Sequence, residues 1–299
     1  MSGAIISLMK FAILSDIHGN LPALRAVTAD IQAWQPDQVI VNGDIVNRGP
    51  CSRDCLHFVL EKQATCGWHL LRGNHEDYIL YCANPDFETE GPGFEVTRFA
   101  YWVYQQLNGE IEFLRELPDQ YSWYAPDGSE LRVVHGSMLN NRDGIYKRAS
   151  DELIREQIAP APALFATAHT HQPLIRQVDE TLVVNTGSVG SPFDRDQRPS
   201  YGRITWNPTN GWQAEIKRVP YDLSLIEADY VASGFLDEGG PLAQLMLIEL
   251  RKARGLIFRW AYNYEDAVRA GNISMEESVR RIMLEEDVRP YLGAPGWEL

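Results

Sequence analysis

The amino-acid sequence predicts an α/β fold. In the first hundred residues, short apolar runs typical of buried strands alternate with segments whose apolar residues recur at helical spacing. From residue 121 onward strand-like runs follow one another more closely, and from residue 222 onward helical patterns replace them. The chain has 299 residues, of which 44% are hydrophobic and 23% charged, which is enough for one large core and a smaller second one.

The first strand is predicted over residues 10–15, KFAILS, an apolar run that ends at Asp16. Asp16 and His18 then fall on the loop beyond the carboxyl end of this strand. A helix is expected next, because Asn20 is a favourable N-cap residue and Pro22 suits the first helical turn. The apolar face of this helix is predicted to consist of Leu21, Leu24, Val27 and Ile31.

Two further strands repeat this arrangement. Residues 38–42, QVIVN, precede Asp44, and residues 68–72, WHLLR, precede Asn74 and His75. In open α/β sheets, ligands bind in the crevice beyond the carboxyl ends of the strands. The polar residues at these strand ends are therefore expected to meet in one site, although they lie far apart in the sequence.

The remaining elements are predicted from the same patterns. Helices are expected at 95–117, 240–262 and 275–286. Five more strands are predicted at 121–124, 131–135, 164–169, 181–185 and 201–206. Because these five runs follow one another closely, we expect them to form a second and more antiparallel sheet. Residues 1–220 would then form one domain, and residues 221–299 a helical extension packed on it.

The charge balance argues against nucleic-acid and membrane partners. The chain carries 41 acidic and 27 basic residues, a net charge of -14, which repels nucleic-acid backbones and anionic membranes. We therefore expect no binding of nucleic-acid duplexes and no association with a membrane. The same charge would repel an anionic substrate unless bound cations and arginines reverse the field locally.

Cysteine usage and the lack of sorting signals indicate a cytoplasmic protein. Cys51, Cys55, Cys66 and Cys82 match no zinc-binding spacing and are too few for a disulfide scaffold. We expect reduced and mostly buried thiols. Residues 1–8, MSGAIISL, lack the basic flank of a signal peptide, and no run of about 20 apolar residues is long enough to span a bilayer.

The polar residues at the predicted strand ends are typical ligands of a metal ion. Five of the seven histidines fall in short motifs of this kind. Carboxylate and amide oxygens combined with imidazole nitrogens suit Mn, Fe or Zn. Each motif by itself also fits a helix cap, a turn or a core histidine, and a structural zinc site is disfavoured because such sites are usually rich in thiolates. The candidate ligands are Asp16, His18, Asp44, Asn74, His135, His169 and His171.

The motifs DIHGN, GD, GNHE, HG and HTH, in this order from Phe11 to about Ser188, resemble the signature of the calcineurin-like metallophosphoesterases. The resemblance implies a four-layer sandwich of two β-sheets flanked by helices, with the C-terminal helical extension outside it. It also implies two divalent metal ions, Mn, Fe or Zn. One ion would be bound by Asp16, His18 and His171, the other by Asn74, His135 and His169, and Asp44 would bridge them because a carboxylate has two oxygens to share.

The reaction implied by this resemblance is hydrolysis of a phosphoester. A hydroxide that bridges the two metals would attack phosphorus in line, and the alcohol would leave on the opposite side. His75 would protonate the leaving oxygen as a general acid. Asn47 stands where related enzymes usually carry an aspartate that steadies this histidine, so it can hold the ring by a hydrogen bond but cannot stabilise the protonated form by charge.

Two sets of motifs indicate different branches of the family. GDIVNRG at 43–49 and LRGNHE at 71–76 resemble the phosphoprotein phosphatases and symmetrical diadenosine tetraphosphatases. This implies that Arg48 binds the phosphate oxygens, with Arg72 as a second candidate and a surface ion pair as the alternative. AHTH at 168–171 and the later NTGSVGSP resemble the small bacterial phosphodiesterases. The substrate stays open among a phosphomonoester, a phosphodiester, a nucleotide, a dinucleoside polyphosphate and a phosphoprotein.

The loop at 137–150 carries Arg142, Tyr146, Lys147 and Arg148. One interpretation is that Tyr146 stacks on a nucleotide while the cations hold its distal phosphates. A charged loop that is simply solvated is an equal alternative.

The helical extension has an apolar stripe, Leu242, Leu245, Met246 and Leu250, that we expect to pack on the sandwich. A lid over the site and an interface for oligomers are the alternatives. The expected partner of the protein is a small phosphorylated substrate. The main alternative to an enzyme is a metal-binding scaffold of this fold without catalysis, and the presence of His75 argues against it.

Overall fold

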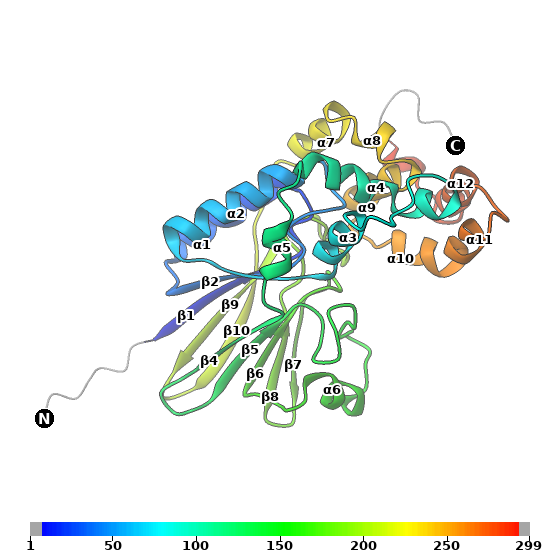
Figure 1. The fold of residues 1–299 in the computed structure, drawn as a ribbon. Helices are drawn as coiled ribbons and strands as arrows, with labels where there is room; N and C mark the ends of the chain where they lie inside the picture. The colour runs from blue at the N-terminus through cyan, green and yellow to red at the C-terminus, as the bar shows by residue number, and fades with distance from the viewer. Residues whose placement is uncertain (1–7, 293–299) are drawn as a thin grey trace, which may run out of the picture.

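Two five-stranded β-sheets lie at the centre of the protein (Figure 1). The computed structural model describes residues 8–292. The first sheet consists of β1 (Met9–Leu14), β2 (Gln38–Asn42), β3 (His69–Leu71), β9 (Ser200–Asn207) and β10 (Gly211–Arg218). Its order is β10-β9-β1-β2-β3. The strands β1, β2 and β3 run parallel, whereas β9 is antiparallel to both of its neighbours.

The second sheet is mixed. It consists of β4 (Gln120–Tyr124), β5 (Glu130–Val134), β6 (Leu164–Thr167), β7 (Leu174–Val178) and β8 (Thr181–Asn185). Its order is β4-β5-β6-β8-β7. The central strands β5, β6 and β8 are parallel, and the two edge strands are antiparallel to their neighbours. The parallel strands of both sheets therefore deliver their carboxyl ends to loops that can face one another.

Helices cover the outer face of each sheet, so the protein has the predicted four layers. The helices α1 (Leu21–Trp34) and α2 (Ser52–Cys66) lie over the first sheet (Figure 1). Leu24 of α1 shares a core with Leu14 of β1. The helix α6 (Asp151–Ile158) covers the second sheet, where Ile154 packs with Phe165. A third core fills the space between the sheets and includes Phe11, Ile13, Ile40, Leu131, Val133 and Leu164.

The start of α1 follows from its sequence. Oδ1 of Asn20 accepts a hydrogen bond from the backbone N–H of Ala23 (3.1 Å), and Pro22 lies in the first turn. The helix begins directly after the loop that carries Asp16 and His18. The cap therefore ends this loop at a defined point, and the predicted strand, loop and helix are confirmed here.

The helical extension lies at one end of the sandwich, beside the helices that follow β3 (Figure 1). Those helices are α3 (Asn74–Cys82), α4 (Pro92–Leu107) and α5 (Glu112–Glu116). The extension contains α7 (Leu223–Ala232), α8 (Phe235–Glu238), α9 (Pro241–Lys252), α10 (Ile257–Trp260), a π-helical turn (Ala261–Glu265), α11 (Asp266–Arg269), α12 (Met275–Glu285) and a 3-10 turn (Arg289–Tyr291). The apolar stripe of α9 is buried within the chain, with Leu242, Leu245, Met246 and Leu250 at most 3% exposed.

Two predictions about the sheets are wrong. The strand predicted at 201–206 does not join the second sheet, because β9 pairs with β1, with Ala12 opposite Arg203. The second sheet is not more antiparallel than the first either, since each sheet has two parallel and two antiparallel strand pairings. The strands β7 and β10 escape prediction because charged and amide side chains interrupt their apolar pattern, as in LIRQV and GWQAEIKR.

Two of the predicted helices are pairs of shorter helices. The helix expected at 95–117 divides after Leu107, where Asn108 and Gly109 take φ values of 47° and 87°. Such left-handed residues end a helix. The helix expected at 240–262 divides in the same way after α9, where Ala253 has a φ of 48°. The helix predicted at 275–286 is confirmed as α12.

All four cysteines are free, and two of them, Cys55 and Cys82, are buried. Cys51 is half-buried and Cys66 is exposed. The expectation that the thiols are mostly buried is therefore confirmed for only two of the four cysteines. Within residues 8–292, no helix combines the length and the apolar character that crossing a membrane requires. The expectation that residues 1–8 are not a signal peptide concerns a segment of which only Leu8 lies within the described residues.

The packing of the extension can be tested at α9. Leu245 is fully buried, whereas Leu225 on α7 is 53% exposed. We expect Leu245→Ala to lower the free energy of unfolding by roughly 2–5 kcal/mol, because it leaves a cavity in the core. The matched change Leu225→Ala should cost less than about 0.5 kcal/mol. Urea unfolding followed by fluorescence measures both, and equal effects would contradict the packing described here.

Candidate metal centre

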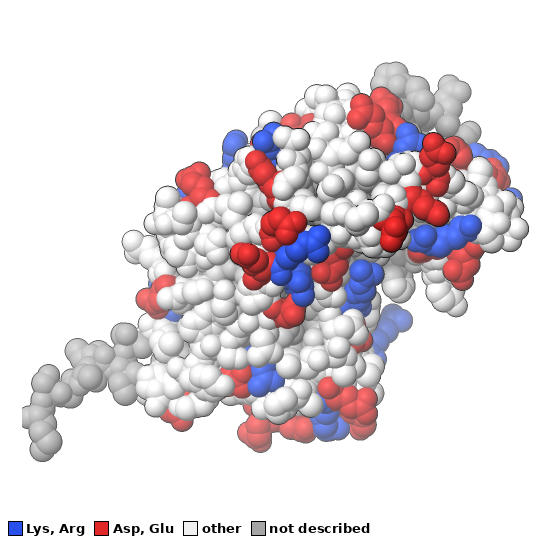
Figure 2. Space-filling view, viewed as in Figure 1, with Lys and Arg blue, Asp and Glu red and all other residues white. Residues whose placement is uncertain are grey.

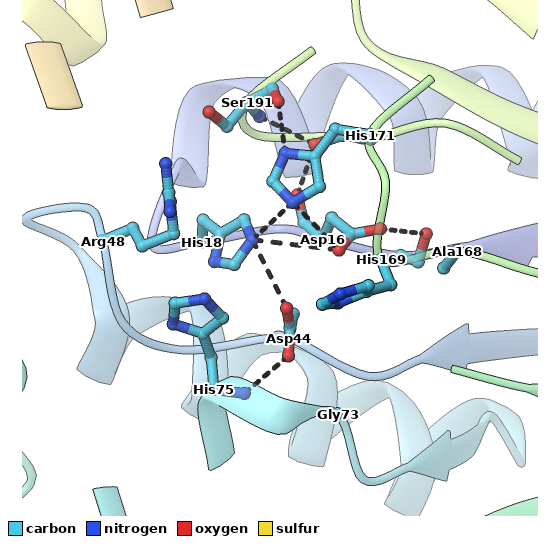
Figure 3. A network of polar contacts seen from close by, with 12 residues as sticks. Asp16, His18, Asp44, Arg48, Gly73, His75, Ala168, His169, His171 and Ser191 are labelled. Carbon is cyan, nitrogen blue, oxygen red and sulfur yellow. Dashed lines mark hydrogen bonds and ion pairs between the residues drawn. The ribbon is translucent and has the colours of Figure 1, made fainter. Parts of the chain in front are cut away.

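Loops beyond the carboxyl ends of five strands meet at one site. Figure 3 shows six of its side chains close together, namely Asp16, His18, Asp44, His75, His169 and His171. The strands are β1, β2, β3, β5 and β6. They bring together all seven candidate metal ligands and His75, which are buried except for the partly exposed His169. The loop after β1 carries Asp16 and His18, and the loop after β2 carries Asp44. Asn74 and His75 follow β3, and His135 follows β5. His169 and His171 lie on the loop after β6.

The first cluster of ligand atoms comes from Asp16, His18, Asp44 and His171, which offer atoms within 4.8 Å of one another. Nε2 of His171 lies 3.1 Å from Nε2 of His18 and 3.2 Å from Oδ1 of Asp16. Nδ1 of His171 is 2.6 Å from the carbonyl oxygen of Ser191. Nδ1 therefore donates to that carbonyl, and the lone pair of Nε2 points into the cluster.

Oδ1 of Asp16 shows that this cluster suits a cation. It is buried and has no hydrogen-bond donor within the described part of the chain. A buried carboxylate oxygen that faces an imidazole lone pair is costly unless a positive charge lies between them. The residues present therefore fit a divalent metal ion.

The second cluster consists of Asp44, His135 and His169, with the amide oxygen of Asn74 among them. Oδ1 of Asn74 is 3.1 Å from Nε2 of His135 and 2.8 Å from Nδ1 of His169. Nδ1 of His135 donates to the carbonyl of Asn42 (2.8 Å), which directs Nε2 toward the cluster. A second cation would find oxygen and imidazole ligands here.

Asp44 belongs to both clusters, but only one of its oxygens faces them. Oδ2 lies 3.5 Å from Nε2 of His18 and 3.3 Å from Nε2 of His135. Oδ1 instead accepts the backbone N–H of His75 (2.8 Å). Oδ2 is therefore the oxygen of Asp44 that lies between the two clusters, while Oδ1 is engaged by the backbone.

Burial and neighbouring charges set the protonation of the metal-free site. Burial lowers the pKa of His18 well below its usual value, and burial together with His135 lowers the pKa of His169 to about 4. Both imidazoles are then neutral at physiological pH and can bind a metal. Burial opposes a proton on His135, but the adjacent Asp44 carboxylate raises the pKa of His135 to about 10. A bound cation would take the place of that proton.

Glu76 organises the site from beneath, and we did not identify it from the sequence. It is fully buried on α3. Its Oε2 accepts the backbone N–H groups of Asp44 and Gly73, both at 2.8 Å. Its Oε1 accepts those of Ile45 (2.8 Å) and Val46 (3.3 Å). One side chain thus ties the loop after β2 to the loop after β3. Glu76 is the glutamate of the GNHE motif, and this motif is the sequence feature from which its role could have been predicted.

His75 and Asn47 lie next to the clusters. Nδ2 of Asn47 is 2.9 Å from Nδ1 of His75. Because an amide nitrogen only donates, Nδ1 of His75 accepts, and the neutral ring carries its proton on Nε2. Burial lowers the pKa of His75 to about 3. Asn47 therefore holds the ring in one tautomer without favouring its charged form, as expected from the sequence.

A cavity of about 740 Å³ opens over Asp44, His75, His169 and His171. Its wall includes residues of the extension, among them Arg254 and Phe258, which the sequence did not indicate. Its lining also includes four cationic side chains, Arg48, Lys147, Arg148 and Arg195, and three aromatic ones, Tyr78, Tyr146 and Phe193. One acidic residue that is not a candidate ligand, Asp194, lies among them and pairs with Arg218. On the face shown in Figure 2, acidic and basic side chains lie next to one another in several small patches, whereas cationic side chains predominate around this cavity.

The predicted arginines are in different positions. Arg48 lines the cavity and forms an ion pair with Glu249 of α9. Arg72 does not line it, and instead forms ion pairs with Asp77 and Asp119 at the surface. For Arg72 the alternative of a surface ion pair is therefore confirmed. Arg142 lies over the ring of Tyr78, outside the lining of this cavity.

Comparisons with known proteins agree with this architecture. The family model described as calcineurin-like phosphoesterase matches residues 9–196. A curated, uncharacterized protein of Methanocaldococcus jannaschii is 23% identical over 228 residues, which are 71% of this chain and 88% of that protein. The crystal structure of a metallophosphoesterase from Sphaerobacter thermophilus has a TM-score of 0.64 and 25% identity, and the match covers 82% of this chain and 99% of the other.

A hypothetical protein from Pyrococcus horikoshii has the same fold. The match to its crystal structure has a TM-score of 0.66 at 21% identity and covers 77% of this chain and 96% of that one. Both structural matches cover more of this chain than residues 9–196 do, so they also include part of the region beyond the family model.

The contribution of Glu76 can be measured with an uncharged replacement. We expect Glu76→Gln to destabilise the protein by about 2–3 kcal/mol, because its amide group cannot accept all four backbone hydrogen bonds. Because the Asp44 loop then loosens, metal affinity should fall by about 10- to 100-fold.

The neighbouring change Asp77→Asn is the matched control. It removes the charge of a partly exposed carboxylate that pairs with Arg72, and it should cost less than about 1 kcal/mol. Thermal unfolding and titration with Mn compare the two variants. Full metal affinity in Glu76→Gln would show that the backbone bonds do not organise the ligands.

Proposed function

Because this chain belongs to the calcineurin-like phosphoesterase family, we propose that it is a metal-dependent phosphoester hydrolase with two divalent ions. The observation that carries the proposal is the pair of buried ligand clusters that share Asp44. A single metal would not need a carboxylate oxygen placed between two sets of histidines. The ligand set suits Mn, Fe or Zn.

We assign Asp16, His18 and His171 to one metal, Asn74, His135 and His169 to the other, and Asp44 to both. When bound, two divalent ions supply a hydroxide nucleophile at neutral pH and neutralise the charge of the phosphate. The protein fixes the ligands before substrate arrives, through the hydrogen bonds of His171 to Ser191 and of His135 to Asn42.

His75 is the proposed donor to the leaving oxygen. Its Nε2–H is held in place by the bond between Asn47 and Nδ1. Asn47 provides no negative charge, so His75 is rarely protonated, and its neutral ring offers the leaving oxygen a hydrogen bond from Nε2–H without transferring the proton. Leaving groups that need little protonation, such as a phosphate in a phosphoanhydride or an aryl alcohol, fit this arrangement best.

The cavity favours a substrate with a second anionic group and a flat ring. Lys147, Arg148 and Arg195 form no ion pair with any described residue. Tyr146 and Phe258 expose 44% and 72% of their surface. Cations beside exposed aromatic rings bind phosphate groups and stack on a base. We therefore propose a nucleotide or a dinucleoside polyphosphate as substrate.

A panel of phosphoesters tests the proposed hydrolase. The protein is stripped of metal, reloaded with Mn, and assayed with nitrophenyl phosphate, bis-nitrophenyl phosphate, diadenosine tetraphosphate and a phosphopeptide. We expect turnover that requires metal and is abolished in Asp44→Asn, because the shared ligand is weakened. Two bound metals without turnover of any compound would favour a scaffold, and preference for the phosphopeptide would favour a protein phosphatase.

The substrate class can be tested at the loop after β5. We expect the double change Lys147→Ala and Arg148→Ala to raise KM for diadenosine tetraphosphate by about tenfold, since two phosphate contacts are lost. KM for nitrophenyl phosphate, which lacks the distal phosphates, should change less than about twofold.

The control is Arg155→Ala on α6. Arg155 is an exposed arginine that pairs with Asp179 and does not line this cavity. It should leave both KM values unchanged. An equal rise in KM for the two substrates in the double variant would contradict a subsite for distal phosphates.

A further inference from the structure

The ion pair between Arg48 and Glu249 joins the helical extension to the metal centre. Nη2 of Arg48 contacts Oε2 of Glu249. The Glu249 side chain is completely buried on α9, and the Arg48 side chain is 11% exposed. Arg48 lines the cavity over Asp44 and His75 and lies beside His18 in Figure 3. One edge of its guanidinium is therefore held by the extension while the residue borders the catalytic cavity.

Glu249 is itself fixed by backbone donors. Its Oε1 accepts the N–H groups of Leu256 and Ile257, the latter at 2.7 Å. These bonds tie the carboxylate to the turn between α9 and α10. An ionised carboxylate with two backbone donors and a guanidinium partner is satisfied in a buried position. Glu249 thus forms a rigid support, because moving its carboxylate would leave two buried N–H groups unpaired.

The backbone of Arg48 is held from the extension as well. Asn47 and Arg48 take φ values of 71° and 66°, a left-handed conformation that costs about 1–2 kcal/mol per residue. The hydroxyl of Tyr230, on α7, donates to the carbonyl oxygen of Arg48 (2.8 Å). Surrounding contacts are needed to maintain such a conformation. The extension therefore holds both the backbone and the side chain of this residue.

A third contact orients the guanidinium relative to the metal ligands. Cζ of Arg48 lies 5.5 Å from the ring centre of Phe193. Phe193 in turn stacks on His171, with ring centres 4.2 Å apart and an angle of 18° between the planes. Glu249 and Phe193 thus hold the guanidinium between the extension and a ligand of the first cluster.

We propose that Glu249 is a positioning residue, which holds Arg48 so that its guanidinium binds the phosphate oxygens of the substrate beside the metal centre. The inference rests on the proposed function, in which Arg48 contacts phosphate. Its physical basis is electrostatic as well as geometric. Two divalent cations repel a nearby guanidinium, and the buried charge of Glu249 offsets that repulsion. Without Glu249, Arg48 would turn away from the metals toward solvent.

Binding of inorganic phosphate to the Mn-loaded full chain tests this proposal without requiring turnover. Calorimetric titration compares the wild type with Arg48→Met, Glu249→Gln and the double variant. Glutamine keeps the size of the side chain and an oxygen for the backbone donors, but it lacks the charge. We expect each single change to raise Kd for phosphate by about tenfold, which is about 1.4 kcal/mol. The double variant should match Arg48→Met, because Glu249 acts through Arg48.

The matched control is Glu227→Gln, which removes a glutamate of the extension that pairs with Arg251 and does not line the cavity. Its Kd for phosphate should equal that of the wild type. Metal content and melting temperature are measured for every variant. If Glu249→Gln does not fold, Tyr230→Phe replaces it, and loss of the bond to the Arg48 carbonyl should raise Kd about threefold.

An unchanged Kd in Glu249→Gln would overturn the proposal, as would additive losses in the double variant. A wild type that binds phosphate but hydrolyses none of the panel would refute the proposed hydrolase, while the Kd values would still decide whether Glu249 positions Arg48. A wild type that binds Mn but no phosphate would overturn both.

Discussion

The backbone hydrogen bonds to Glu76 are the interaction on which the rest of the site depends. Four N–H groups from two loops converge on this one buried carboxylate. The close approach leaves no space for a side chain at Gly73, where an added Cβ would lie 2.2 Å from Oδ1 of Asp44. Asp44 can therefore reach both ligand clusters only because the loops after β2 and β3 are locked together beneath it.

The candidate metal centre is also where left-handed backbone conformations are concentrated. Seven of the ten predicted site residues have positive φ values, which non-glycine residues rarely adopt, namely Asp16, His18, Asp44, Asn47, Arg48, His169 and His171. Such conformations persist when surrounding bonds outweigh their cost. For Asp16 and His18 these include bonds from their own N–H groups to the carbonyls of Gly43 and Asp44. The left-handed conformations, together with the hydrogen bonds that maintain them, direct the side chains of several short loops into one site.

Charge is distributed to match this site. The chain has a net charge of -14, yet four basic side chains, Lys147, Arg148, Arg195 and Arg254, border the cavity together with Arg48. Acidic ligands lie at the bottom of the site and cations along its wall, an order that suits metal ions below and phosphate groups above them. The helical extension contributes Arg254 to the wall of the cavity. It also contributes Glu249, which forms an ion pair with Arg48.

The sequence by itself determined the local features of this protein. Alternating apolar runs predicted β1, β2 and the helix capped by Asn20, and the ordered motifs indicated all seven ligand candidates that the structure brings together. These signals are local because strand, cap and ligand chemistry are encoded within a few neighbouring residues. Only the tertiary structure decided the pairing of β9 with β1, the four bonds of Glu76, the surface position of Arg72 and the contact between Glu249 and Arg48. Apart from the bond between Glu76 and nearby Gly73, those features join residues tens to hundreds of positions apart. No local pattern records which distant partner a side chain meets when the chain packs.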